Sequence, residues 1–93
     1  MARVVITPQA LQDLRQLVAD LGLGDPALLR VQKSLRMLER FPLAGRALTG
    51  VWEGTRFLIG PWPWMIIVYV HDAADDAVSV VSVHDGRSGD RPA

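Results

Sequence analysis

The sequence predicts an α+β domain with the order β-α-α-β-β-β, in which a helical hairpin packs on a mainly antiparallel four-stranded sheet. Three observations lead to this fold class. One short β-branched segment comes first, two apolar stripes at helical spacing follow it, and three strand-like segments end the chain. The 93 residues suffice for one core, so residues 1–93 are expected to form a single domain.

The chain opens with a predicted strand and a capped helix. Residues 2–6 (ARVVI) are rich in β-branched side chains, which is typical of a strand. Thr7 then offers a hydroxyl cap, and Pro8 stands at the first helical position. Glycines at positions 22 and 24 end this helix. Its apolar residues recur at helical spacing: Leu11, Leu14, Val18 and Leu21.

A second helix follows after a very short loop. Asp25 and Pro26 repeat the cap signal, and Phe41-Pro42 ends the helical pattern. Two amphipathic helices joined in this way are expected to pack as an antiparallel hairpin. The apolar stripe of the second helix consists of Leu28, Val31, Leu35 and Leu38.

The segment after the hairpin predicts two strands, the second of them inside the sheet. Residues 43–50 form a connector without periodicity, and residues 51–59 form a strand that Gly54 interrupts. Residues 64–71 are apolar at successive positions, so both faces of this strand should be covered.

The last part of the chain predicts one more strand and a polar tail. The turn AADD at residues 73–76 leads into a strand over residues 77–84. Residues 86–93 are polar, and we expect them to fray.

The composition argues against several classes of protein. Without cysteine there is no disulfide, thiol nucleophile or thiolate metal site, and the two histidines form no metal motif. The longest uncharged run, residues 57–70, is shorter than the roughly 20 residues of a membrane span. The apolar stretch at the N-terminus is too short for a signal peptide. We expect a cytoplasmic protein with no cofactor, metal, membrane partner or small-molecule substrate.

The charges are unevenly distributed although the formal net charge is zero. Residues 30–56 contain six basic and two acidic side chains, whereas residues 61–93 contain two basic and five acidic ones. A basic middle beside an acidic end permits one surface that faces a polyanion.

Three stretches, together with the order of elements, carry a family resemblance. Residues 54–61 (GTRFLIGP) join a glycine, an arginine and a glycine turn to an apolar strand that ends near Tyr69. Residues 80–87 (VVSVHDGR) place a histidine shortly before an arginine, and residues 4–14 (VVITPQALQDL) give a strand and a capped helix. The chain thus resembles the RelE/ParE toxin superfamily of bacterial type II toxin–antitoxin systems.

The resemblance implies a toxin that a cognate antitoxin neutralises, with a role in plasmid stabilisation. The chain is nearer the ParE-like branch, which is associated with inhibition of DNA gyrase. The ribosome-dependent ribonuclease branch typically has an arginine at the start of the strand that leads to Tyr69, and a catalytic tyrosine or histidine near the C-terminus. Here that strand starts Trp64-Met65, and no tyrosine follows Tyr69. The alternatives are a ribosome-dependent endoribonuclease acting on mRNA, and a non-toxic member that retains only antitoxin binding.

Three residues are the catalytic candidates if the protein is a ribonuclease. RNA cleavage requires an acid, a base and cations for the phosphate, and Arg56, His84 and Arg87 offer them. A structural role is the other interpretation: Arg56 would pair with Glu53 or an aspartate of the tail, and His84 with Asp85 or a backbone carbonyl.

A second set of residues is predicted to bind a partner. Three tryptophans lie within thirteen residues, and burying all of them together is difficult, so at least one is expected at an interface. The segment that contains two of them, Trp-Pro-Trp, looks like an insertion relative to both branches. The partner-binding set is Trp52, Arg56, Trp62, Trp64 and Arg87.

Other polar residues are expected to have structural roles. Tyr69 should bury its ring and find a partner for its hydroxyl. His71 and Asp72 should serve the acidic turn that follows them. The basic residues of the second helix are expected to form a solvated face: Arg30, Lys33, Arg36 and Arg40.

Overall fold

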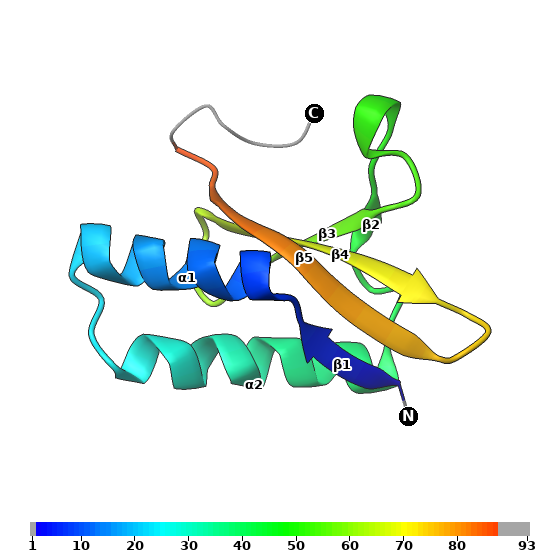
Figure 1. Ribbon diagram of the computed structural model, residues 1–93, viewed down its shortest axis with the longest axis horizontal. Coiled ribbons are helices and arrows are strands. Elements are labelled where there is room, and N and C mark those ends of the chain that lie inside the picture. The colour runs from blue at the N-terminus through cyan, green and yellow to red at the C-terminus, as the bar shows by residue number, and fades with distance from the viewer. Residues whose placement is uncertain (1, 88–93) are drawn as a thin grey trace.

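Two helices cover one face of a five-stranded sheet in the computed structural model, which describes residues 2–87 (Figure 1). The two helices run antiparallel, as the hairpin prediction requires. The elements are β1 (Arg3–Ile6), α1 (Pro8–Leu21), α2 (Pro26–Arg40), β2 (Arg46–Ala47), β3 (Arg56–Ile59), β4 (Met65–Asp72) and β5 (Ala77–Asp85).

The sheet is mixed and mainly antiparallel, with the spatial order β1-β5-β4-β3-β2. Within residues 2–87 only the β1–β5 pair is parallel, and β4 lies between β3 and β5. The α+β class and the interior position of β4 are therefore confirmed.

Two details of the strand prediction need correction. The sheet has five strands rather than four, because Arg46 and Ala47 pair with Phe57 and Arg56 at its edge. The strand predicted from residue 51 begins only at Arg56. Residues 50–52 instead form a 3₁₀ turn, and Gly54 adopts a left-handed φ of 90° that breaks the extended chain.

Both helices begin and end where the sequence signals place their ends. The Thr7 hydroxyl accepts a hydrogen bond from the Ala10 amide at 3.2 Å and donates one to the Val80 carbonyl at 2.8 Å. Gly22 ends α1 with a φ of 62°, and α2 ends at Arg40, before Phe41. The α2 helix begins at Pro26 as predicted, but Asp25 at its N-cap position has helical dihedrals and its side chain makes no capping hydrogen bond.

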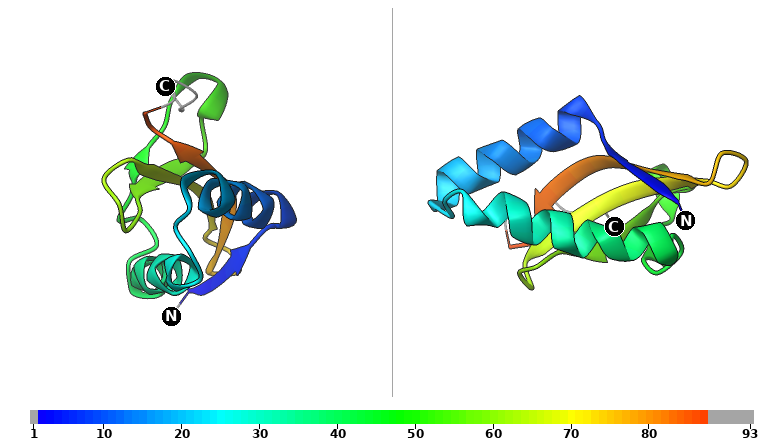
Figure 2. Two further views of the ribbon diagram at one scale, coloured as in Figure 1. Left: turned by 90° about the vertical axis from the view of Figure 1, so that its left-hand side faces the viewer. Right: turned by 90° about the horizontal axis from the view of Figure 1, so that it is seen from below.

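The main core lies between the helical hairpin and the sheet (Figure 2). Leu14, Leu35 and Leu38 are buried there, and Val18 packs against them while partly exposed. Odd-numbered residues of β4 supply the floor of this core: Met65, Ile67 and Tyr69.

A smaller apolar cluster covers the opposite face of the sheet. Ile66 and Val68 of β4 are buried there with Leu48, and Trp52 and Phe57 pack against them. Both faces of β4 are therefore covered, which explains why this strand is apolar at successive positions.

The chain stays attached to the sheet just beyond β5. The Gly86 amide donates a hydrogen bond to the Trp64 carbonyl at 2.7 Å, and the Arg87 amide donates one to Asp85 at 2.9 Å. The rest of the tail expected to fray, residues 88–93, lies outside the described residues.

Candidate functional site

Arg56 holds the connector between α2 and β3. Its Nη1 donates to the Gly45 carbonyl at 2.9 Å and to the Leu43 carbonyl at 3.4 Å. The buried Tyr69 hydroxyl accepts a hydrogen bond from the Gly45 amide at 2.8 Å, as expected for a buried tyrosine. No ion pair joins Arg56 to Glu53 within residues 2–87. The guanidinium is therefore engaged by backbone carbonyls.

His84 lies on the face of the sheet that has no helices. It stands opposite Ile66 in the β4–β5 register, and Ile66 belongs to the cluster on that face. Its Nε2 shares a hydrogen bond of 2.9 Å with the Ser82 hydroxyl rather than with Asp85. The ring meets Trp52 edge to face, with centroids 5.8 Å apart.

Arg87 is fixed by a carboxylate and an aromatic ring. Its Nε and Nη2 donate to the two oxygens of Asp85 at 3.1 and 3.2 Å. Its guanidinium carbon lies 4.6 Å from the centre of the Trp64 ring. These hydrogen bonds lower the pKa of Asp85 below its ordinary 3.8 and raise the pKa of Arg87.

The Asp85–Arg87 pair gives the fold a small, acid-sensitive contribution. Because the pKa of Asp85 is lowered in the folded chain, the pair stabilises the fold above about pH 4. This stabilisation is lost as the pH falls through the lowered pKa of Asp85. Asp85→Asn should lower the thermal midpoint slightly at about pH 7, and the difference from wild type should shrink as the pH is lowered below about 4. Asp75→Asn is the control, since this exposed residue belongs to no described ion pair. If the difference in thermal midpoint between Asp85→Asn and wild type stays constant as the pH is lowered, the Asp85–Arg87 pair does not contribute to stability as described.

Two of the predicted partner-binding tryptophans stack on each other. The rings of Trp62 and Trp64 have centroids 5.7 Å apart and planes inclined by 19°. The guanidinium carbon of Arg30 lies 4.4 Å from the centre of the Trp62 ring. The sequence predicts a solvated position for Arg30 on its helix. The contact with Trp62 could not be predicted from the sequence, because the two residues are far apart in the chain.

The three catalytic candidates do not meet. Arg56 stands opposite Tyr69 in the β3–β4 register, and Tyr69 faces the helices. His84 stands opposite Ile66, on the other face of the sheet and roughly 10 Å farther along β4 at 3.3 Å per residue. The structure instead brings together Trp52 with His84, and Trp62 with Trp64 and Arg87.

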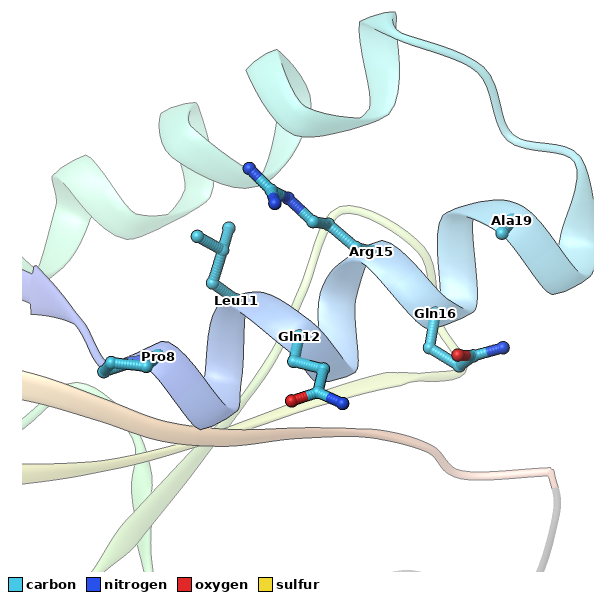
Figure 3. A pocket seen from close by; sticks show the side chains of 6 residues that line it. All are labelled: Pro8, Leu11, Gln12, Arg15, Gln16 and Ala19. Carbon is cyan, nitrogen blue, oxygen red and sulfur yellow. The ribbon is translucent and has the colours of Figure 1, made fainter.

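One surface hollow is lined by His84 together with Asp13, Asp20 and Asp85, and neither Arg56 nor Arg87 lines it. Figure 3 shows a hollow along α1 that is lined by none of the predicted site residues; Leu11 and Arg15 project from one side of the helix and Gln12 and Gln16 from another. Within residues 2–87, no three acidic or histidine side chains are grouped to hold a metal ion. No helix in this part of the chain is long and apolar enough to cross a bilayer.

The fold is that of RelE/ParE-type toxins, as three solved structures show. The toxin–antitoxin complex RelBE2 from Mycobacterium tuberculosis aligns with a TM-score of 0.67 at 22% identity, covering 90% of this chain and 96% of that one. A copper-bound mutant toxin from Helicobacter pylori aligns with a TM-score of 0.70 at 20% identity, covering 95% and 98%. YafQ from E. coli aligns with a TM-score of 0.65 at 16% identity, covering 98% and 100%.

The family follows from the sequence match. The model of the ParE toxin of type II toxin–antitoxin systems, parDE, matches residues 4–88. The chain belongs to this family and is the toxin of a type II toxin–antitoxin system, with a cognate antitoxin as partner. No curated protein matches the sequence.

Proposed function

We propose that this toxin is a non-hydrolytic inhibitor of DNA gyrase, of the ParE-like branch, that acts in the cytoplasm and serves plasmid stabilisation. The observation that supports this proposal is the separation of the three groups that RNA cleavage would need. Arg56 and His84 lie on opposite faces of the sheet, and Arg87 lies beyond the end of β5.

Cleavage at a 2′-hydroxyl needs its acid, base and cation within hydrogen-bond reach of one phosphate. Arg56 and His84 cannot reach one phosphate from opposite faces of a sheet. Their polar atoms are also engaged, Arg56 by two carbonyls and His84 by the Ser82 hydroxyl. This arrangement favours binding over hydrolysis.

Inhibition by binding needs only a shaped surface with fixed contact groups. The surface at the end of β5 has such a group, because Asp85 and the Trp64 ring hold the exposed Arg87 in one orientation. A fixed guanidinium loses little entropy when it binds a carboxylate or a phosphate. We therefore assign Arg87 to the contact with gyrase.

The test measures supercoiling and translation separately. Purified toxin should abolish the supercoiling of relaxed plasmid by gyrase, and it should leave mRNA intact in a translating extract. Arg87→Glu reverses the contact charge, so we expect at least about 10-fold more toxin to be needed for half-inhibition. Arg87→Glu also removes the pair with Asp85 and the contact with Trp64, so we expect a small decrease of the thermal midpoint, and thermal unfolding is measured on the same sample to show that the variant is folded.

The matched control is Arg46→Glu, which reverses an exposed charge on the edge strand β2; β3 and β4 lie between this strand and β5, beyond which Arg87 lies. It should inhibit gyrase as wild type does. Ribosome-dependent cuts in mRNA that vanish in a His84→Ala variant would overturn the proposal and establish the ribonuclease instead. A toxin with neither effect, yet still bound by its antitoxin, would identify the non-toxic member.

A further inference from the structure

Four side chains from three separate parts of the chain form one stack. Trp62 and Trp64, in the β3–β4 turn, are the stacked pair; Arg30 of α2 lies over the first ring, and Arg87 beyond β5 lies over the second. We call these four residues the Arg–Trp stack. It ties the helical hairpin to the end of the sheet, since each guanidinium is attracted to the ring face beneath it.

An apolar hollow opens beside the stack at the Arg87 end. Its apolar wall includes Ile59, which is 47% exposed although it is a large β-branched residue. Arg87 places a cation at the hollow. The lining consists of Ile59, Pro63, Trp64, Ile66, Gly86 and Arg87.

The other end of the stack presents a cation with free donors. Arg30 is exposed, and no carboxylate among residues 2–87 pairs with it. A guanidinium stacked on a ring keeps its N–H groups at its edge, where they match a carboxylate in two parallel hydrogen bonds. The stack thus combines a preordered cation with an apolar recess, and each can anchor a different kind of side chain.

We propose that the Arg–Trp stack and its hollow bind an acidic segment of the cognate antitoxin. A bulky apolar side chain of that segment enters the hollow against Ile59 and Trp64, and a carboxylate nearby in the segment binds Arg30. The segment crosses the tryptophan edges between these two points. The stack then determines specificity, because an antitoxin that lacks one of the two anchors leaves either the hollow empty or Arg30 without a carboxylate partner.

Charge and chemistry favour an acidic protein segment as the occupant. The exposed Lys33 lies one turn from Arg30 on α2, so the two cations together attract an acidic chain. Aromatic and arginine side chains are also the residues that anchor protein interfaces most often. The inference rests on the antitoxin as partner and is independent of the target of the toxin.

The test compares affinities for the antitoxin encoded beside the toxin gene, measured by isothermal titration calorimetry with the full-length toxin. Arg30→Gln should weaken binding about 10-fold by removing one charge-assisted contact. Arg30→Glu should weaken antitoxin binding further, because a glutamate at this position would repel the carboxylate of the antitoxin. Arg40→Gln is the control: it removes the same charge about 15 Å along α2, and it should change the affinity less than about 2-fold.

A second variant tests the apolar anchor. Trp64→Leu removes a stacked ring and part of the hollow, and we expect at least about a 30-fold loss of affinity if the domain stays folded. Its folding is checked by thermal unfolding, because Trp64 also packs on the main core. Should this variant unfold, Arg30→Gln and Arg30→Glu still decide the question.

Several outcomes overturn the proposal. Equal affinities for wild type, Arg30→Gln and Arg40→Gln show that the antitoxin does not use the stack. Equal losses for Arg30→Gln and Arg30→Glu exclude a carboxylate partner. If Arg30→Gln instead changes the sedimentation of the isolated toxin, the occupant is a second copy of the chain. Gyrase supercoiling is a separate readout, so failure of the proposed target leaves these measurements interpretable.

Discussion

Leu38→Ala is expected to lower the free energy of unfolding by about 2–5 kcal/mol, the range for truncating a buried leucine. Leu38 is 0% exposed and lies in the core cluster between α2 and the sheet. Truncation loses the transfer free energy of the removed methyl groups and leaves a cavity that the neighbouring strands cannot fill. A chain of 93 residues has a small core and little stability to spare.

The measurement is denaturant unfolding followed by circular dichroism, with Leu29→Ala as the control. Leu29 lies on the same helix but is 63% exposed, so its truncation should change the free energy of unfolding by less than about 0.5 kcal/mol. Similar free energies of unfolding for the two variants would mean that Leu38 is not in the core, and they would refute the packing of α2 described above.

Gly45→Ala should destabilise the protein by about 2–4 kcal/mol. A Cβ atom at this position would lie 2.8 Å from both Cε1 and the hydroxyl of Tyr69, and still closer to the Phe57 carbonyl oxygen. The backbone of Gly45 also donates to Tyr69 and accepts from Arg56. Relief of the clash must therefore displace the connector and weaken both hydrogen bonds.

Tyr69→Phe tests the hydrogen bond without the clash. It leaves the buried Gly45 amide without its partner, so we expect a loss of about 1–3 kcal/mol. Ala44→Ser, at the exposed neighbouring residue, should stay within about 0.5 kcal/mol of wild type. Wild-type stability of Gly45→Ala in denaturant unfolding would mean that the connector does not pack against Tyr69.

Local patterns of the sequence determine the helices and the central strand. The stripes through Leu14 and Leu38 predict the helical hairpin because side chains four residues apart share one helix face. Thr7 predicts the start of α1 because its hydroxyl serves the amide three residues later. The continuous apolar run of β4 predicts burial on two faces, which a strand reaches only inside a covered sheet.

The candidate site was predictable only in part. Trp62, Trp64 and Arg87 were expected to bind a partner, and the structure brings them together. Arg30 has no signal in its own segment, because it reaches Trp62 only when the hairpin docks on the sheet. The separation of Arg56 from His84 depends on strand register, since a shift of one residue moves every side chain to the other face.

The sequence by itself therefore determined the elements whose stability is local: the caps, the amphipathic helices, the apolar strand and the order that marks the toxin family. Tertiary structure alone decided that the two-residue strand β2 forms, because its residues become a strand only by hydrogen bonding to β3. It also decided that Arg56 binds carbonyls and that Arg30 and Arg87 share one stack. These contacts join residues far apart in the chain, and only packing of the helices on the sheet brings them within reach.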